Sequence, residues 1–344
     1  PTLADSQAVS TIGRWVKNNT PINIKAYRDL GTASLVTPLN IQGGLPTCNF
    51  QKGSFDAAHK IIGETMKDTI LVRRKSCFAC PVQCKRAVKV DEPYTVDPRY
   101  GGPEYETIAA LGSNCGIDDL KAIAKGNELT AAYGLDSISC GSVIAFAMEC
   151  FEHGLLTTRD TKGLELVFGN GPAMLQMIEQ ISMRQGLGAL LSEGIARASK
   201  IIGPATKEFA LQIKGQELPM HEPRWKQGMG VGFSMSPTGA DHCHNMHDSA
   251  YTRITPLLEQ LKAVGILEPL PANDLSPAKI RLLIYDSMWI HFLNCAVCCY
   301  FVMVRGLVGF ERMAQLVSAV TGWNTSVFEL VNVGERAATL ARAF

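Results

Sequence analysis

Apolar residues recur every three to four positions along most of this chain, a spacing that predicts amphipathic helices. Four such stretches, each followed by glycine, are expected in the first two thirds: Asp119–Tyr133, Ser139–His153, Pro172–Gln185 and Leu190–Ile202. Four more are expected later: Pro256–Val264, Pro277–Val304, Glu311–Thr321 and Ser326–Phe344. Only Ala87–Val90 and Phe209–Ile213 alternate as short strands do. The pattern therefore predicts a mainly α protein.

The periodicity stops between Lys214 and His247, where Gly, Met, His and Pro are frequent. A stretch of this composition is typical of a functional loop between packed units. We therefore expect two packed, largely helical domains, residues 1–213 and 214–344. A further loop is expected at Glu268–Asp274.

The composition fits globular domains, because 46% of the 344 residues are hydrophobic and 19% are charged. The formal charge of +1, with basic residues spread along the chain, gives no sign of a nucleic-acid partner. The longest apolar stretch, Trp289–Val304, contains His291 and Asn294 and is shorter than the roughly 20 residues that span a bilayer. The 11 cysteines fit reduced thiols and a cytoplasmic location better than a disulfide framework.

Three of these cysteines, Cys77, Cys80 and Cys84, have the spacing CxxCxxxC in the segment SCFACPVQCK. Thiolates in a short loop suit a four-iron cluster, with structural zinc and packed core cysteines as alternatives. No second pair follows at the distance usual for zinc. A fourth ligand must come from elsewhere, and the next group of cysteines is the segment NCAVCCYF.

Two further segments carry candidate chemistry. In GGPEYET, Glu106 lies where burial would suit a proton shuttle, although Glu104 and Glu106 are also typical of a helix start. The segment SPTGADHCHNMHDSAY holds three closely spaced histidines, which suit either a metal or a polar surface: His242, His244 and His247.

Taken in order along the chain, these segments resemble the tungsten-dependent aldehyde ferredoxin oxidoreductase family. The resemblance rests on CFACPVQC, GPEYETIAALGSNCGI, YGLDSIS, GQELPMHEPRWKQGMG, TGADH, CCYF and the tail TGWN to GERAATLARAF. It covers essentially the whole chain and implies the fold of that family's two helical C-terminal domains. The family's N-terminal domain has no counterpart here, so we expect the sequence to be a fragment that binds the cofactor poorly alone.

The resemblance also implies a cofactor set, namely a tungsten or molybdenum ion held by two pterins beside a 4Fe-4S cluster. The cluster ligands map onto Cys77, Cys80, Cys84 and Cys299, the last because a cysteine followed by one residue and Phe matches Cys299-Tyr300-Phe301. The catalytic glutamate maps onto Glu106 and the active-site histidine onto His242. Cys115 is offered as a direct tungsten ligand, a packed thiol being the alternative.

The family's two pterin motifs fall on Ala131–Asp136 and Asn294–Cys299. The leading aspartate of each motif is replaced here, by Ala131 and by Asn294. The cofactor contacts expected from the resemblance are Leu135, Asp136, Asn294 and Cys298.

We therefore expect an oxidoreductase that interconverts aldehydes and carboxylic acids and passes electrons through the cluster to ferredoxin or an electron-transfer subunit. The alternatives are the catalytic subunit of a dearomatising aryl-CoA reductase of the same family, and a non-catalytic iron-sulfur or zinc module. No nucleic-acid partner or membrane span is expected, and a homo-oligomer is left open.

Overall fold

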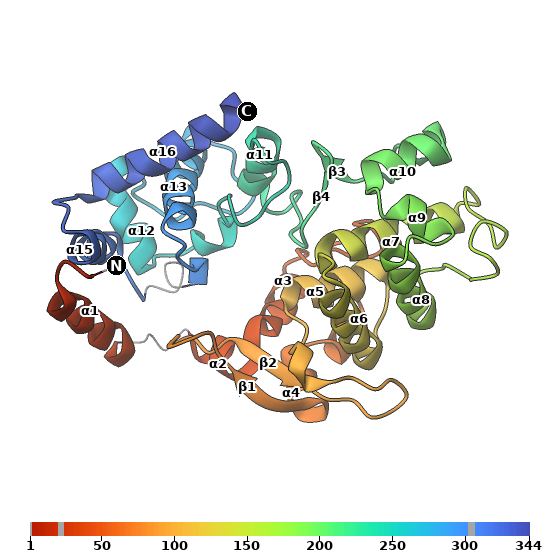
Figure 1. The fold of residues 1–344 in the computed structure, drawn as a ribbon. Helices are drawn as coiled ribbons and strands as arrows, with labels where there is room; N and C mark the ends of the chain where they lie inside the picture. The colour runs from red at the N-terminus through yellow and green to blue at the C-terminus, as the bar shows by residue number, and fades with distance from the viewer. Residues whose placement is uncertain (1, 20–23, 302–306) are drawn as a thin grey trace. The chain divides into compact units, whose positions relative to one another are not determined.

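The computed structural model describes residues 2–19, 24–301 and 307–344 (Figure 1). The chain divides into two compact units. Unit 1 comprises residues 1–25, 80–82 and 223–344, and unit 2 comprises residues 26–79 and 83–222. Helices dominate both units, which confirms the mainly α prediction, and the sheets of the described residues are two-stranded. The domain boundary expected at Lys214 stays a prediction.

Unit 2 is built around α7, whose residues are buried on almost every side. This helix packs so closely on α5 that a side chain at Gly141 would meet the backbone of Ala110 at 2.6 Å. Strands β1 and β2 form an antiparallel hairpin in which Lys75 pairs with Lys85. The elements of unit 2 are α2 Lys25–Leu30, α3 Val36–Ile41, α4 Gly63–Thr69, β1 Leu71–Lys75, β2 Lys85–Val88, α5 Tyr105–Leu111, α6 Leu120–Tyr133, α7 Ser137–Glu152, α8 Gly171–Ser182, α9 Leu187–Leu191, α10 Ile195–Ile202, β3 Gln212–Ile213 and β4 Gln216–Glu217.

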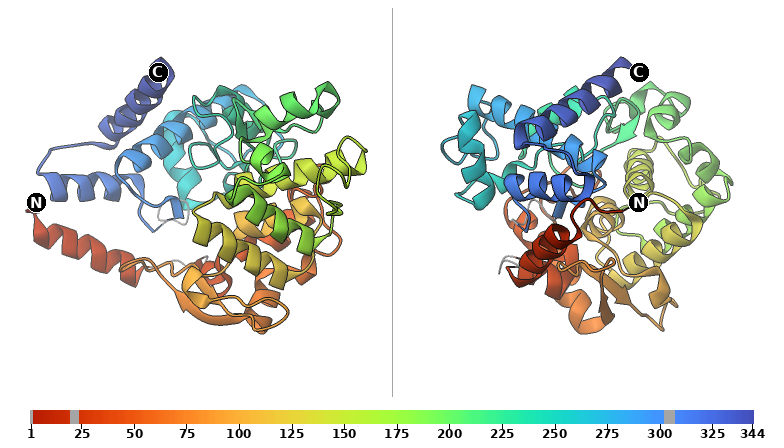
Figure 2. Two further views of the ribbon diagram at one scale, coloured as in Figure 1. Left: turned by 45° about the vertical axis from the view of Figure 1, so that its right-hand side comes forward. Right: turned by 60° about the vertical axis from the view of Figure 1, so that its left-hand side comes forward.

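Unit 1 is held together by two helix pairs. Helix α13 contacts α16 so closely that a Cβ atom at Gly334 would lie 1.7 Å from the carbonyl oxygen of Met288. Helix α1 contacts α15 (Figure 2). The Arg312 guanidinium lies 3.3 Å from the centre of the Trp15 ring. The helices of unit 1 are α1 Ser6–Asn18, α11 Gln227–Met235, α12 Pro256–Gln260, α13 Pro277–Cys295, α15 Phe310–Thr321 and α16 Val327–Ala343.

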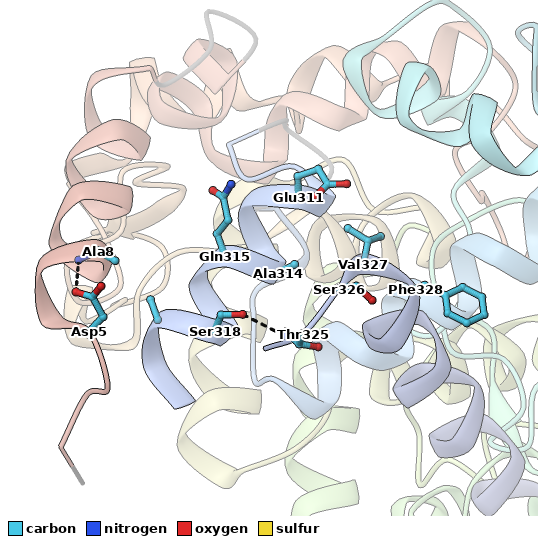
Figure 3. Close-up of a pocket in the computed structure, with 11 residues that line it drawn as sticks. Asp5, Ala8, Glu311, Ala314, Gln315, Ser318, Thr325, Ser326, Val327 and Phe328 are labelled. Atoms are coloured by element: carbon cyan, nitrogen blue, oxygen red, sulfur yellow. Dashed lines mark hydrogen bonds between the residues drawn. The ribbon is translucent and has the colours of Figure 1, made fainter. Parts of the chain in front are cut away.

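A cavity of about 710 Å³ lies between α1, α15 and the start of α16 (Figure 3). Its lining includes Asp5, Glu311, Gln315 and the exposed ring of Phe328. None of the site residues expected from the sequence lines this cavity.

Four of the expected helices are shorter than the periodicity predicted or are divided. Pro172–Gln185 ends as α8 at Ser182, and Pro256–Val264 ends as α12 at Gln260 and continues as a 3₁₀ helix. Leu190–Ile202 is divided into α9 and α10 at Gly194, where the backbone is left-handed and Glu217 accepts a hydrogen bond from the N–H of Ile195. Pro277–Val304 ends as α13 at Cys295, because Val297 adopts φ +52°. The last three residues of that expected helix lie outside the described residues.

The aperiodic region also contains a helix that the pattern did not predict. Helix α11 begins at Gln227 and carries glycines at 228, 230 and 232, which obscured its periodicity. Across the described residues, no helix is both long enough and apolar enough to cross a membrane.

Candidate active site

The GPEYE segment forms the start of α5 and presents Glu106 to a second segment of unit 2. One carboxylate oxygen of Glu106 lies 3.0 Å from Nε2 of His221, and the other accepts a hydrogen bond of 2.8 Å from the backbone N–H of Met220. Both side chains are shielded from solvent, with 16% of the Glu106 side chain and 5% of the His221 side chain exposed. A carboxylate and an imidazole at this distance share one proton readily.

Tyr105 holds this pair in place. Its hydroxyl donates to the carbonyl oxygen of Met220, and its ring stacks on the His221 ring with centroids 5.6 Å apart. Burial, together with the nearby Glu106 charge, raises the pKa of Tyr105 well above its ordinary value. The phenol therefore stays protonated and acts as a fixed donor that sets the position of residues 220 and 221.

His221 was not among the residues expected from the sequence. It lies in GQELPMHEPRWKQGMG, a segment that carried the family resemblance, yet its proximity to Glu106 depends on a contact between residues more than 100 positions apart. The only feature of the sequence that could have indicated His221 as a site residue is its position in an aperiodic segment, close to two prolines.

Glu104, the first glutamate of the GPEYE segment, has a different role from Glu106. Glu104 forms an ion pair of 3.0 Å with Lys85 of β2 and accepts a short hydrogen bond from the Thr32 hydroxyl. Although burial opposes it, the Glu104 charge holds the pKa of Lys85 above its ordinary value. Glu104 thus links the start of α5 to the strand that follows the expected iron-sulfur ligands.

Those ligands lie on the connection between β1 and β2, which we call the cysteine loop (residues 76–84). Cys77 is exposed and Cys80 and Cys84 are partly exposed, so none of the three thiols is packed into a core. The donor set of three accessible thiols therefore fits a metal cluster better than it fits core cysteines. Cys77 and Cys84 belong to unit 2, whereas Cys80 and the exposed Cys299 belong to unit 1.

The histidine loop (residues 236–251) lies in unit 1. Nε2 of His242 lies 3.5 Å from the sulfur of Cys243, and the His242 ring meets the His247 ring edge-on at 5.9 Å. Ligand atoms of Asp241, His242 and Cys243 lie within 4.8 Å of one another, which would allow them to hold a metal ion. The structure therefore gathers the predicted His242 into a group of potential ligands.

Asp241 and His244 form a second polar pair in this loop, with Oδ2 and Nδ1 3.0 Å apart. Burial favours the neutral acid, but the hydrogen bond and charge of His244 keep the pKa of Asp241 below its ordinary value. The same hydrogen bond raises the pKa of His244 against the effect of burial. In contrast, burial and the neighbouring His244 lower the pKa of His291, whose ring stacks on that of His244 at 5.1 Å.

The second expected pterin segment begins in the last turn of α13 and continues beyond the end of that helix. The Asn294 side chain donates to the carbonyl oxygen of Cys243 at 3.3 Å, which joins this segment to the histidine loop. Cys295 and Cys299 are exposed, while burial and the charge of Cys299 raise the pKa of Cys298.

The first expected pterin segment connects α6 and α7 in unit 2. Leu135 is half-buried, and both carboxylate oxygens of Asp136 accept hydrogen bonds from backbone N–H groups at the start of α7. Asp136 therefore caps this helix. The cofactor contacts expected at Leu135 and Asp136 stay a prediction.

Cys115 is completely buried in unit 2. Its thiol donates to the carbonyl oxygens of Ala110 and Gly141 at 3.3 and 3.5 Å, and burial raises its pKa well above the ordinary value. This environment suits a packed thiol. The role of Cys115 as a tungsten ligand stays a prediction.

Comparisons with known proteins agree with the resemblance seen in the sequence. Residues 7–344 match the family described as aldehyde ferredoxin oxidoreductase, domains 2 and 3. The chain belongs to the aldehyde ferredoxin oxidoreductase family. It is 34% identical to a tungsten-containing aldehyde ferredoxin oxidoreductase of Thermococcus kodakarensis and 32% identical to one of Pyrococcus furiosus, in each case over 99% of this chain and 54% of the relative.

The chain thus spans about half the length of these curated relatives. A more distant relative, 27% identical over 77% of this chain and 38% of its own length, is the WOR-like subunit of an aliphatic sulfonate oxidoreductase from Pyrococcus furiosus. Among solved structures, the active site complex BamBC of benzoyl coenzyme A reductase matches with a TM-score of 0.74 and 17% identity, over 99% of this chain and 57% of that one. This last likeness concerns the fold alone.

Proposed function

We propose that this chain forms the two C-terminal domains of a tungsten-dependent oxidoreductase that interconverts aldehydes and carboxylic acids. The observation that carries the proposal is the pair of the largely shielded Glu106 and the buried His221, held by Met220 and Tyr105 in a chain of this family. Oxidation of a hydrated aldehyde removes two electrons and releases protons. A tungsten pterin centre, when bound, would accept the electrons.

In this proposal the protein residues manage the protons. Glu106 takes a proton from water or from the aldehyde hydrate, because its Oε2 is oriented by the Met220 N–H while Oε1 faces His221. His221 then shares that proton through Nε2, and the neutral Tyr105 keeps the imidazole in place. His242 of the histidine loop is proposed to polarise the substrate carbonyl.

Cys77, Cys80, Cys84 and Cys299 are proposed to hold the 4Fe-4S cluster that carries electrons away. The charge of the β1–β2 hairpin favours a negatively charged electron carrier, such as ferredoxin, as the partner. Residues 71–89 contain six basic residues, of which all but Arg86 are at least partly exposed, and no acidic residue. The Phe78 side chain in the cysteine loop is fully exposed. A basic surface with an apolar centre suits a transient acidic partner.

Replacing Glu106 with Gln tests the proposal. Gln keeps the shape of the side chain but accepts no proton, so we expect aldehyde oxidation to fall by at least about a hundredfold while tungsten and iron contents stay unchanged. Glu193→Gln is the matched control, because Glu193 pairs with Arg184 and Arg197 on the surface of unit 2. Retention of most activity in Glu106→Gln would remove this carboxylate from the mechanism.

The second candidate is the catalytic subunit of an aryl-CoA reductase. It stays open because the leading aspartates of both pterin motifs are replaced here, by Ala131 and by Asn294. Assays of the anaerobically purified protein with aldehydes and with aryl-CoA esters separate the two. Metal analysis that finds zinc, without iron or tungsten, would refute both in favour of a structural module.

A further inference from the structure

Arg86, on β2 and two residues after Cys84, is a buried cation beside the cysteine loop, with 4% of its surface exposed. Its guanidinium is surrounded by main-chain carbonyl oxygens. Nη2 donates to Tyr27, Arg28 and Gln83 at 2.8, 2.9 and 2.9 Å, and Nη1 donates to Asp29 at 3.4 Å.

These carbonyls come from two separate segments. Three of them belong to α2, near its C-terminal end, where helix carbonyls lack intrahelical partners and carry partial negative charge. The fourth, that of Gln83, belongs to the cysteine loop. One side chain therefore ties the end of α2 to the loop that carries the expected ligands.

The loop needs this support because its backbone is bent at two places. Ala79, directly before Cys80, has φ +51°, and Gln83, directly before Cys84, has φ +56°. Each non-glycine residue in the left-handed region costs roughly 1 kcal/mol. The hydrogen bond from Arg86 to the Gln83 carbonyl stabilises the bend that orients Cys84.

The packing around the guanidinium leaves no space for another side chain. Gly31 follows α2 with φ +69°, and a Cβ atom there would lie 2.9 Å from Nε of Arg86 and 3.0 Å from the carbonyl oxygen of Cys84. Glycine is therefore required for the helix end, the guanidinium and the loop to meet.

The charge of Arg86 has no carboxylate partner among the described residues. The nearby carboxylates of Asp29 and Glu104 form ion pairs with Arg74 and Lys85 instead. In addition, the buried Nε–H of Arg86 has no hydrogen-bond acceptor within the described part of the chain. A buried cation requires compensating negative charge, and the thiolates of the adjacent loop would supply it.

We propose that Arg86 is a positioning residue for the iron-sulfur cluster, which preforms the Gln83–Cys84 turn and balances the charge of the cluster thiolates. This inference rests on the proposed function, since it takes Cys77, Cys80 and Cys84 to be cluster ligands. A fixed cation beside a redox centre stabilises the form that carries the additional electron. Arg86 therefore raises the reduction potential of the cluster.

The first test measures the reduction potential of the cluster, by redox titration followed by electron paramagnetic resonance of the protein as the cell makes it, purified anaerobically. Arg86→Gln should lower the reduction potential of the cluster. Arg86→Lys keeps the positive charge, so its reduction potential should stay close to that of wild type. Arg74→Gln is the matched control, because Arg74 lies on the same hairpin but is half-exposed and paired with Asp29. A wild-type potential in Arg86→Gln would overturn the charge role.

The second test uses hydrogen exchange in metal-free protein and does not depend on the cluster. Both Arg86 variants should speed amide exchange in residues 77–84 by at least about tenfold, while Arg74→Gln leaves it unchanged. Wild-type exchange in both Arg86 variants would overturn the positioning role. If Arg86→Gln loses its iron, Arg86→Lys tests the charge role instead. The charge role then requires that Arg86→Lys has the iron content and the reduction potential of wild type. A wild-type protein without iron would refute the proposed function, and the exchange result would still decide the positioning role.

Discussion

The most demanding prediction concerns a buried ion pair in unit 1 that fixes the end of the histidine loop. Nζ of Lys279 lies 2.7 Å from Oδ1 of Asp248, and neither side chain is exposed. The carboxylate also accepts hydrogen bonds from the N–H groups of Gly228 and Met229 at 3.2 and 2.8 Å, which begin α11. Asp248 therefore joins α11, α13 and the histidine loop.

Replacing Lys279 with Met removes the cation and leaves a buried carboxylate with two neutral donors. Loss of one partner from a buried ion pair costs about 3–5 kcal/mol, because the remaining charge is uncompensated. The lost hydrogen bond from Nζ to the Pro271 carbonyl, 2.8 Å in length, keeps the estimate in the upper half of that range. The double variant Asp248→Asn with Lys279→Met removes both charges and should recover roughly 1–3 kcal/mol.

Urea unfolding followed by tryptophan fluorescence measures this effect selectively. All four tryptophans lie in unit 1, namely Trp15, Trp225, Trp289 and Trp323. With a denaturant dependence of about 2 kcal/mol/M, the predicted loss moves the fluorescence midpoint down by about 2–2.5 M urea. Circular dichroism, to which the helices of both units contribute, should retain a transition from unit 2 near the wild-type midpoint.

Lys262→Met provides the control. Lys262 pairs with Glu259 on the surface, where both side chains are about half-exposed, so its replacement should cost no more than about 1 kcal/mol. The reasoning is refuted if Lys279→Met lowers stability no more than Lys262→Met, or if the double variant is less stable than Lys279→Met alone.

Three other predictions concern proton binding, the cluster and the partner. Burial raises the pKa of Asp286 from 3.8 to about 7; the Tyr251 hydrogen bond opposes this shift and the Asp248 charge adds to it. The folded state therefore binds one more proton than the unfolded state between about pH 4 and 7, so the free energy of unfolding should fall as pH rises through this range. In urea unfolding, wild type should lose roughly 3 kcal/mol more between pH 5 and 8 than Asp286→Asn does. Cys299→Ala should lose or degrade the cluster, measured as iron content and visible absorption, whereas Cys295→Ala should keep it intact. Arg73→Gln should slow electron transfer to an acidic ferredoxin roughly two- to tenfold at low salt. Equal rates for wild type and variant at all salt concentrations would contradict the proposal that ferredoxin binds the basic surface of the β1–β2 hairpin.

Helix positions were predictable where local chemistry decides them. Helix α6 ends at Gly134 in the left-handed conformation, as its sequence predicted, and its first turn is capped by Asp119. The break at Gly194 was not predictable in the same way, since the N–H of Ile195 is bonded by Glu217, a residue from a later hairpin. Local periodicity contains no information about such a partner.

The candidate site shows the same division between local and distant information. The resemblance pointed to Glu106 from its own segment, but the partner of that carboxylate comes from the segment around His221. Likewise, the charges that surround Arg86 are backbone carbonyls of α2, which no side-chain pattern could reveal. Single residues of the candidate site were therefore predictable from their own segments, whereas their partners within each unit are evident only in the structure.

Within unit 2, the cysteine loop and Glu106 are attached to one scaffold. Strand β2 leaves the loop with Lys85, which pairs with Glu104, and Glu104 in turn is bonded to Thr32, whose oxygen accepts the Tyr105 N–H at 2.8 Å. The two glutamates of the GPEYE segment thus have separate roles, since Glu104 fixes the segment to β2 while Glu106 faces His221. Because this linkage is continuous, a displacement of β2 would reach Glu106 through Glu104, so the proposed cluster ligands and the proposed proton acceptor depend on the same few contacts.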